Sequence, residues 1–344
     1  MPAEVDPARL RTLAAAFSGK RVLVVGDLML DEFIWGKVSR ISPEAPVPVV
    51  NVASESSYPG GAANVARNVR EFTPSVAMIG IVGADSHGAR LLRLLEEAGI
   101  ETGGVQQDPA RTTAVKTRVV ARNQQVVRID RERNAPLSDD QTRCAMRTIE
   151  AAVPGVDAVI VADYGKGFLA QALADFVSET VRRHGRVLAV DPHPHTSLLW
   201  RRATVIKPNR TEAFLAAGLP PSDPAPLPLE DAPLLEAGRR LLESWETENL
   251  VVTLGEDGML VLRRGAEAFT SPARAREVFD VSGAGDTAIA ALALAFSAGA
   301  TAAEAAELAN IASGIAVGKV GTATVSAAEL ERELGGPHAA ETRP

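Results

Sequence analysis

The chain has 344 residues but only one cysteine, Cys144, so a disulfide framework is excluded. A catalytic thiol is not expected either, because no helix start or clear catalytic motif surrounds Cys144. A single thiol fits a reducing compartment, and we expect a cytoplasmic protein. The N-terminus carries Glu4, Asp6 and Arg9 and no long apolar run, so we expect no signal peptide.

Excess positive charge is also missing. The chain has 36 Lys and Arg against 43 Asp and Glu, a net charge of −7, which argues against a nucleic-acid-binding surface. No stretch reads as a convincing membrane span. The most apolar one, around 288–300, is short and rich in alanine, and a Gly-Asp motif occupies its first turn. We therefore expect small-molecule partners and neither nucleic acid nor membrane.

Strand and helix patterns alternate along the chain, and its length suits one large α/β domain over residues 1–344. Apolar strands are expected at 21–26, 76–82, 158–162, 187–190, 250–254 and 259–262. Helical patterns separate many of them, for example 88–98, 169–184 and 234–245. This alternation predicts a mostly parallel sheet covered by helices on both faces. The Pro-rich stretch 220–233 is expected to be an exposed loop.

Two segments break the alternation. Residues of about 33–52 and 112–129 have β-like patterning with several arginines. They predict a small β unit outside the main sheet, or else a peripheral hairpin.

The ends of the predicted strands carry polar side chains. Asp27, Asp163, Asn209 and Thr253 lie at or just after strand ends. Ligands of parallel α/β sheets bind beyond the carboxyl ends of the strands. We therefore expect the binding site at this edge.

The most informative stretch is Asp280-Val-Ser-Gly-Ala-Gly-Asp-Thr287. Its Gly-Ala-Gly turn precedes Asp286 and an uncharged apolar segment that reads as a buried helix. Free backbone N–H groups at such a helix start attract negative charge. Phosphoryl transfer needs such donors and also a base for the attacking hydroxyl, and Asp286 is placed to be that base. The alternative is that Asp286 only caps the helix.

A second glycine motif lies near the N-terminus, at Gly60-Gly61-Ala-Ala-Asn64. Glycines let a ligand approach the backbone closely. Asn64 offers both a donor and an acceptor to a hydroxylated ligand.

These two motifs, in this order, resemble the paired signatures of the ribokinase-like (PfkB) carbohydrate kinases. Lys207-Pro-Asn209-Arg-Thr-Glu212 looks like the family's Asn-x-x-Glu element, which acts near magnesium and the nucleotide phosphates. Val251-Val-Thr253-Leu-Gly255-Glu-Asp-Gly258 looks like its strand and turn beside the nucleotide. The resemblance runs from about residue 20 to about residue 328. It implies a three-layer α/β/α domain with a mostly parallel sheet, in which the small β unit is a lid over the sugar that often pairs across a homodimer.

The resemblance also implies roles for individual residues. Asp286 would be the base, and the N–H groups of Gly283, Ala284 and Gly285 would stabilise the transferring phosphate. The residues implied to bind ATP are Asn209, Arg210, Thr211, Glu212, Thr253, Gly255, Gly258 and Asn310. Asn209 and Glu212 would hold Mg²⁺ through water, and Asp280 and Ser282 a monovalent cation such as K⁺.

A narrower resemblance is to the heptose 7-phosphate kinases of lipopolysaccharide core synthesis. It is carried by four segments: Val25-Gly26-Asp27-Leu-Met-Leu-Asp31, the Ser-Pro-Glu-Ala-Pro-Val-Pro run within 39–49, Arg122-Asn123-Gln-Gln125 leading to Arg128-Ile-Asp130, and Asp163-Tyr-Gly-Lys166-Gly. The chain departs from that subfamily at Asp191-Pro-His193-Pro-His195, where Asp-Pro is usually followed by Lys-Gly. A lysine role is therefore not expected there.

A phosphorylated sugar needs carboxylates and amides for its hydroxyls and cations for its phosphate. The candidate substrate residues are Asp27, Asp31, Gly60, Gly61, Asn64, Arg122, Asn123, Asp163 and Lys166. Arg40, Arg118 and Arg128 are further candidates for the phosphate.

We therefore expect an ATP-dependent kinase that phosphorylates the anomeric hydroxyl of D-glycero-D-manno-heptose 7-phosphate to give the 1,7-bisphosphate. One alternative is a PfkB kinase for ribose, a fructose phosphate or a nucleoside, and a second is a non-catalytic sugar-binding protein on the same fold. The chain ends soon after Leu330, so we expect the nucleotidyltransferase that some relatives carry to be a separate enzyme.

Overall fold

The computed structural model describes residues 5–122, 124–274, 278, 280–319 and 323–335. A nine-stranded sheet forms the body, in the order β13-β12-β11-β10-β9-β8-β1-β4-β5. Its strands pair in parallel except for β12, which runs antiparallel to both of its neighbours. The strands are β1 (Arg21–Gly26), β4 (Ser75–Gly83), β5 (Glu101–Asp108), β8 (Ala158–Ala162), β9 (Val187–Asp191), β10 (Val205–Ile206), β11 (Asn249–Thr253), β12 (Met259–Arg263) and β13 (Phe269–Ser271).

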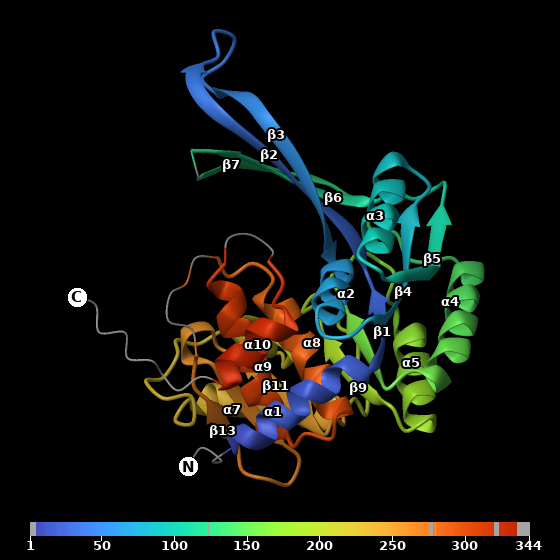
Figure 1. Ribbon diagram of the computed structural model, residues 1–344, viewed down its shortest axis with the longest axis vertical. Coiled ribbons are helices and arrows are strands. Elements are labelled where there is room, and N and C mark those ends of the chain that lie inside the picture. Colours follow the sequence, from blue (N-terminus) through green and yellow to red (C-terminus); the bar gives the residue numbers. More distant parts are fainter. Residues whose placement is uncertain (1–4, 123, 275–277, 279, 320–322, 336–344) are drawn as a thin grey trace.

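Helices cover both faces of this sheet, so the body is a three-layer α/β/α domain (Figure 1). Buried side chains of α1, α2, α3, α8, α9 and α10 pack in one apolar cluster, and those of α4, α5, α6 and α7 pack in a second. The helices are α1 (Pro7–Ala15), α2 (Ala62–Arg70), α3 (Ser86–Glu97), α4 (Asp139–Ala152), α5 (Gln171–Arg183), α6 (Arg210–Ala216), α7 (Ala232–Ser244), α8 (Ala284–Ser297), α9 (Ala302–Val317) and α10 (Ala327–Gly335).

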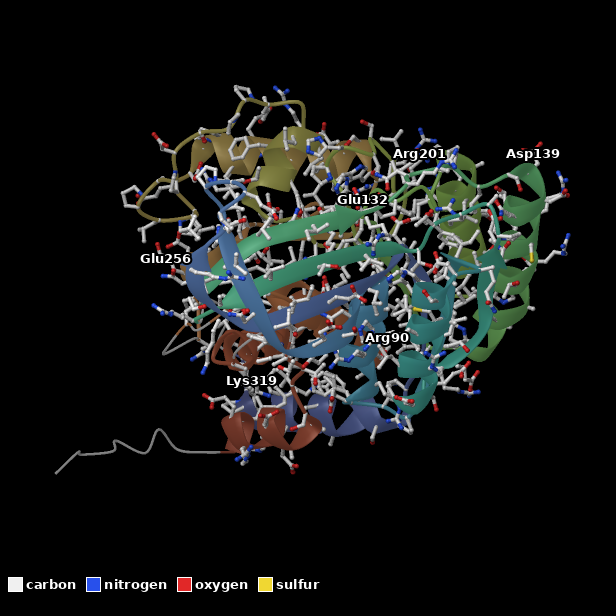
Figure 2. The ribbon with its side chains drawn as sticks, turned by 90° about the horizontal axis from the view of Figure 1, so that it is seen from above. Arg90, Glu132, Asp139, Arg201, Glu256 and Lys319 are labelled. Atoms are coloured by element: carbon white, nitrogen blue, oxygen red, sulfur yellow. The ribbon has the colours of Figure 1, made fainter. Side chains whose placement is uncertain are left out.

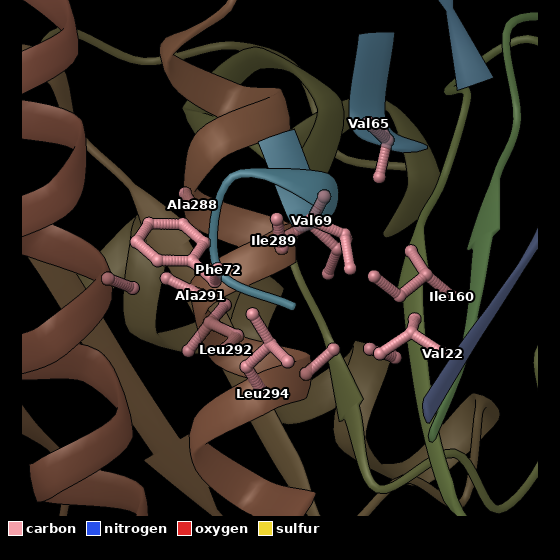
Figure 3. Close-up of a cluster of buried hydrophobic side chains, with 14 of the residues drawn as sticks. Val22, Val65, Val69, Phe72, Ile160, Ala288, Ile289, Ala291, Leu292 and Leu294 are labelled. Atoms are coloured by element: carbon pink, nitrogen blue, oxygen red, sulfur yellow. The ribbon is translucent and has the colours of Figure 1, made fainter. Parts of the chain in front are cut away.

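The apolar strands form because both of their faces are buried. In β1, Val22 and Val24 belong to one apolar cluster, whereas Leu23 and Val25 belong to the other. Figure 3 shows part of the first cluster, in which side chains of α8 and α2, among them Ile289 and Val69, pack together with Val22 of β1. A strand buried on both faces reads as a continuous apolar run, which is why its sequence identified it.

All six strands and three helices expected from the sequence are present, with ends that coincide or differ by at most two residues. Three further strands, β5, β10 and β13, were not anticipated. β5 is an edge strand that carries polar residues, and β10 and β13 have only two and three residues. Such short or half-exposed strands lack the apolar run that marks a buried one. The expected loop at 220–233 ends where α7 begins, at Ala232.

A separate four-stranded sheet, in the order β3-β2-β6-β7, extends from the body (Figure 1). Its strands are β2 (Leu28–Ile41), β3 (Pro48–Gly61), β6 (Ala114–Ala121) and β7 (Gln124–Arg131). Seen from above, these strands lie across the body (Figure 2). The two irregular segments of the sequence are therefore strands of one sheet. This sheet begins closer to the body than expected, because β2 follows β1 almost directly and β3 runs into α2.

No helix in the described part of the chain has the length and apolarity needed to cross a membrane.

The two glycine motifs meet through the helices that follow them. α2 and α8 pack side by side in the first cluster (Figure 3). The Thr287 hydroxyl of α8 donates a hydrogen bond of 2.7 Å to the buried Asn68 side-chain oxygen of α2. The Asn68 amide in turn donates to the backbone carbonyl of Asn64 at 2.9 Å. This bond fixes the relative position of the two motifs.

We expect Thr287→Val to lower the free energy of unfolding by about 1–3 kcal/mol, because it leaves the buried Asn68 oxygen without its donor. Urea denaturation followed by circular dichroism would measure the change. Thr12→Val is the matched control, because the Thr12 hydroxyl bonds only the Ala8 carbonyl on the exposed side of α1. That control should stay within about 0.5 kcal/mol of the wild type, and an equal effect of both variants would contradict the expectation.

Candidate active site

A cavity of about 1010 Å³ lies at the carboxyl ends of the central strands. Asp163 follows β8, Asp191 ends β9, and Lys207 follows β10. Thr253 ends β11, and all four residues line the cavity. The site thus lies at the edge where parallel α/β sheets bind their ligands.

The Gly-Ala-Gly turn opens α8 at the wall of this cavity. Gly283 is the N-cap and has φ 84° and ψ −3°, the left-handed conformation that a side chain disfavours. Ala284 and Gly285 begin the helix and line the cavity together with Asp286. The Ala284 N–H donates to the Val281 carbonyl over a long 3.3 Å. The first turn of a helix presents N–H groups without intrahelical acceptors, so this wall favours an anion.

The Asp286 carboxylate is held from two other parts of the chain. The Tyr164 hydroxyl donates to its Oδ1 atom at 2.6 Å, and the Asn64 amide donates to its Oδ2 atom at 2.6 Å. Burial raises the pKa of Asp286 from 3.8 to about 6, and the two hydrogen bonds oppose that rise. Each carboxylate oxygen can accept a further hydrogen bond. The carboxylate is therefore fixed in position and charged near neutral pH.

Asp27 is 2% exposed, and its carboxylate oxygens accept hydrogen bonds from the protein backbone. Its carboxylate accepts backbone N–H groups from Tyr164, Lys166 and Phe168, each at 3.0 Å. Asp27, proposed from the sequence as a substrate ligand, thus also holds the loop between β8 and α5 in place. This loop carries Tyr164, so Asp27 positions the partner of Asp286.

The glycines of the first motif serve close packing within the protein. A Cβ atom on Gly60 would lie 2.2 Å from the Asp31 carboxylate, and one on Gly61 would lie 2.8 Å from the Asp27 carbonyl. Gly61 also has a positive φ of 59°. Asp31 forms an ion pair with Arg118 of β6. The lack of side chains at these two glycines is thus also needed for close packing within the protein.

Asn209 and Glu212 line the cavity at the start of α6, where they form a capping box. The Glu212 N–H donates to Asn209 Oδ1 at 2.9 Å, and the Asn209 N–H donates to Glu212 Oε2 at 2.7 Å. No group of three or more His, Cys, Asp or Glu residues in the described chain could enclose a metal. Mg²⁺ keeps several waters and needs few protein ligands, so this pair fits a hydrated Mg²⁺ held through water.

Other residues proposed from the sequence are distributed around the cavity. Asp163, Gly255, Gly258 and Asn310 line it with Thr253. Asp163 accepts hydrogen bonds from the Gly165 N–H and the Thr196 hydroxyl, and burial raises its pKa to about 6. The Asn310 amide is used within the fold, where it donates to the carbonyls of Ser271 and Pro272.

Several proposed residues do not line the cavity. Arg210 forms an ion pair with Asp231 at 2.7 Å, and Thr211 is exposed on α6.

The residues proposed for the substrate phosphate and the monovalent cation also lie outside this cavity. Arg122 is exposed in the turn between β6 and β7, and its neighbour Asn123 lies outside the described residues. Lys166 pairs with Glu132 at 2.7 Å beside a small second pocket that Asp27 also lines. Asp280 accepts the Ser282 N–H at 2.9 Å just before α8.

The cavity residues that were not proposed as site residues from the sequence include Tyr164, Asp191 and Lys207. Each lies at or just after a strand end, which is the signal that identified Asp163 and Asn209. His193, which stands at the departure from the subfamily pattern, also lines the cavity.

The chain matches the model of the pfkB family of carbohydrate kinases over residues 20–329. It is 45% identical over 318 residues to bifunctional protein HldE of Desulfatibacillum aliphaticivorans, covering 92% of this chain and 64% of the relative. It is 44% identical over 334 residues to bifunctional protein HldE of Geobacter sulfurreducens, covering 97% of this chain and 67% of the relative. The chain thus spans about two thirds of the length of these relatives.

Solved structures share the fold. Ribokinase of Arabidopsis thaliana, complexed with ribose and ATP, superposes with a TM-score of 0.69 at 18% identity, covering 92% of this chain and 99% of the other. Phosphofructokinase-2 of Escherichia coli, in complex with potassium, superposes with a TM-score of 0.74 at 18% identity, covering 92% and 98%. The chain belongs to the pfkB family of carbohydrate kinases, and it is a phosphotransferase that acts on a sugar hydroxyl.

We expect Asp286→Asn to become more stable relative to the wild type as the pH rises. Because burial raises the folded-state pKa of Asp286 from 3.8 to about 6, its stabilising contribution is complete below about pH 4 and is lost as the pH rises through about 6. The difference in unfolding free energy between variant and wild type should therefore grow by about 1–2 kcal/mol between about pH 4.5 and about pH 7.5.

Urea titrations at the two pH values would measure this difference. Asp139→Asn is the control, because Asp139 is exposed at the start of α4 (Figure 2). An Asp286→Asn difference that does not change with pH would mean that the carboxylate is not destabilised by burial.

Proposed function

We propose that the protein transfers the terminal phosphate of ATP to the anomeric hydroxyl of D-glycero-D-manno-heptose 7-phosphate, giving heptose 1,7-bisphosphate. The observation that carries the kinase part is the Asp286 carboxylate, held by Tyr164 and Asn64 beside the N-terminus of α8. The choice of heptose rests on the subfamily motifs at 25–31, 39–49, 122–130 and 163–167. The relatives named HldE support the same subfamily.

In the proposed reaction Asp286 accepts the proton of the anomeric hydroxyl while that oxygen attacks the γ-phosphorus of ATP. The bond between the γ-phosphorus and the bridging oxygen breaks, and ADP leaves. The N–H groups of Gly283, Ala284 and Gly285 face the charge that develops on the phosphate, as a helix N-terminus can. A fixed base and fixed donors need no reorganisation during the step.

The nucleotide is proposed to occupy the large cavity along Thr253, Gly255, Gly258 and Asn310, with Arg210 and Thr211 contributing from α6. Asn209 and Glu212 would hold Mg²⁺ through water, which would supply positive charge to the ATP phosphates. Asp280 and Ser282 remain the proposed site for a monovalent cation such as K⁺.

The sugar is proposed to bind between this cavity and the four-stranded sheet. Asp27, Asp31, Asn64 and Asp163 would contact its hydroxyls, with Gly60 and Gly61 lining the approach. Arg122, Asn123 and Lys166 are the proposed residues for its 7-phosphate, because cations with several donors suit a phosphate.

The four-stranded sheet is proposed to act as a lid and as the homodimer surface of a cytoplasmic enzyme with a single kinase domain. A lid excludes water, which would otherwise compete for the phosphate. Large apolar side chains are exposed on β2, β3 and β7 and on the turn between β2 and β3. They are Ile41, Val47, Val52, Val126, Val127 and Ile129. Such a group of exposed apolar residues favours pairing with a second copy.

We expect Asp286→Asn to lower kcat by about 10²–10⁴-fold, because the amide keeps the size of the side chain but cannot accept the proton. The wild-type kcat/KM should fall below about pH 6, where Asp286 becomes protonated. A coupled ADP-release assay across pH would measure both effects, and calorimetry should show ATP binding retained. Near wild-type kcat in the purified variant would remove Asp286 from the role of base.

We expect heptose 7-phosphate to be used about 10- to 150-fold more efficiently than the unphosphorylated heptose, because a charge-assisted contact contributes roughly 1.5–3 kcal/mol. Arg122→Ala should erase much of this preference and leave ATP affinity unchanged. Arg143→Ala, on the exposed face of α4, is the matched control.

The same coupled assay would be run across a panel of sugars. Faster turnover of ribose or fructose 6-phosphate would refute the heptose assignment and leave a pfkB kinase for another sugar. Absence of ADP release with every sugar would favour the non-catalytic sugar-binding protein.

A further inference from the structure

A buried lysine, Lys207, lies next to the first turn of α8. The Lys207 side chain is 4% exposed, yet it lines the cavity. A Cβ atom placed on Gly285 would lie 3.4 Å from the Lys207 Nζ atom. A cation thus lies beside the N–H groups that open the helix, where an anion is favoured.

The charge balance of the cavity singles out this lysine. Asp191, Glu212 and Asp286 all line the cavity, so its wall is acidic. Among the described residues that line it, the permanently charged cations are Lys207 and Arg274. Arg274 forms an ion pair with Glu307 of α9. A polyphosphate that enters the cavity near Asp286 would therefore meet Lys207 as its nearby positive charge.

Lys207 is kept charged by its surroundings. Burial lowers its pKa, but the carboxylates of Asp191, Glu212 and Asp286 together outweigh that effect, so the pKa lies above its usual value of 10.5. The Asp191 Oδ1 atom is 3.0 Å from Nζ. An ammonium has three N–H donors. One donor serves Asp191, which leaves others for a ligand at the Gly285 face.

We propose that Lys207 is a catalytic residue whose ammonium contacts the phosphate being transferred, and that Asp191 is the positioning residue that holds it beside Gly285. This rests on the proposed phosphoryl transfer but not on the identity of the sugar. Lys207 keeps its proton throughout and forms no covalent bond. It acts by offsetting the negative charge that spreads over the phosphate oxygens as the bridging bond breaks.

The competing explanation is that Lys207 only neutralises the buried Asp191. Removing one partner of a buried pair leaves an uncompensated charge, which by itself can unfold a protein. Lys207→Met alone would therefore not separate the two explanations. The double variant Lys207→Met with Asp191→Asn removes both charges, so it separates the structural task from the catalytic one.

Four proteins would be compared with the wild type: Lys207→Met, Asp191→Asn, the double variant, and Lys20→Met. Lys20 precedes β1 at the opposite edge of the sheet and controls for the loss of a lysine. Melting temperatures would confirm folding, and ADP release would be followed with whichever sugar the wild type uses fastest. For a catalytic Lys207 we expect kcat of the double variant to stay about 10²–10³-fold below the wild type, the cost typical of losing one transition-state donor.

The KM for ATP should change much less than kcat, because the contact strengthens as the phosphate is transferred. Recovery of the double variant to within a few-fold of the wild type would overturn the proposal and leave Lys207 a structural partner of Asp191. Lys20→Met should match the wild type.

A binding experiment that needs no sugar keeps this test separate from the proposed function. Calorimetry would compare ADP alone with ADP plus aluminium fluoride, which mimics a phosphate in transfer, both in the presence of Mg²⁺. The tighter binding that aluminium fluoride gives the wild type should be lost in the double variant, while binding of ADP alone is kept. Equal enhancement in both proteins would refute a role for Lys207 in phosphate transfer, whatever the acceptor is.

Discussion

The burial of negative charge at one edge of the central sheet is the constraint on which the site depends. Asp27, Asp163, Asp191 and Asp286 lie there, each at or near a strand end or helix start. A carboxylate taken out of water must find donors or a counter-ion, or its charge is strongly disfavoured. Each of the four has them, from backbone N–H groups, hydroxyls, an amide or a lysine. Several of these donors come from distant parts of the chain, such as Tyr164 and Asn64 for Asp286, so the carboxylates also hold those parts together.

The donors only partly offset the cost of burial. Burial raises the pKa values of Asp163, Asp191 and Asp286 to about 6 each, although hydrogen bonds or Lys207 act in the opposite direction. Through these three groups the folded protein is therefore less stable at neutral pH than below about pH 4, where they are protonated. Active sites commonly sacrifice stability in this way, because chemistry needs charges that the fold alone does not. In the proposed reaction, a carboxylate with a pKa near 6 is both ionised at neutral pH and a stronger base than an exposed one.

The sequence was sufficient for the features that local chemistry decides. Strands such as β1 and β8 are apolar along their whole length because both faces are buried, and Gly283 opens α8 in a conformation that suits glycine. The partners of these elements depend on the tertiary fold, which no local pattern contains. Tyr164 is 122 residues from Asp286 in the chain, and no local sequence pattern around Tyr164 predicts the hydrogen bond between them. The close packing at Gly60 could likewise not be foreseen, because the Asp31 carboxylate that crowds it lies on the neighbouring strand β2.

The capping box of α6 shows how one residue pair can carry a structural and a chemical task together. Glu212 Oε2 accepts the Asn209 N–H, so the carboxylate has a fixed orientation at the cavity wall. A capping interaction of this kind stabilises the helix by about 0.5–2 kcal/mol. The other carboxylate oxygen remains for a hydrated cation, which needs a charged acceptor in a fixed place more than it needs a complete cage. A residue that the fold already holds loses little further freedom when it binds a ligand. The Asn-x-x-Glu spacing is therefore explained by helix capping, and the same fixed carboxylate suits the proposed magnesium site because the cap holds it in place.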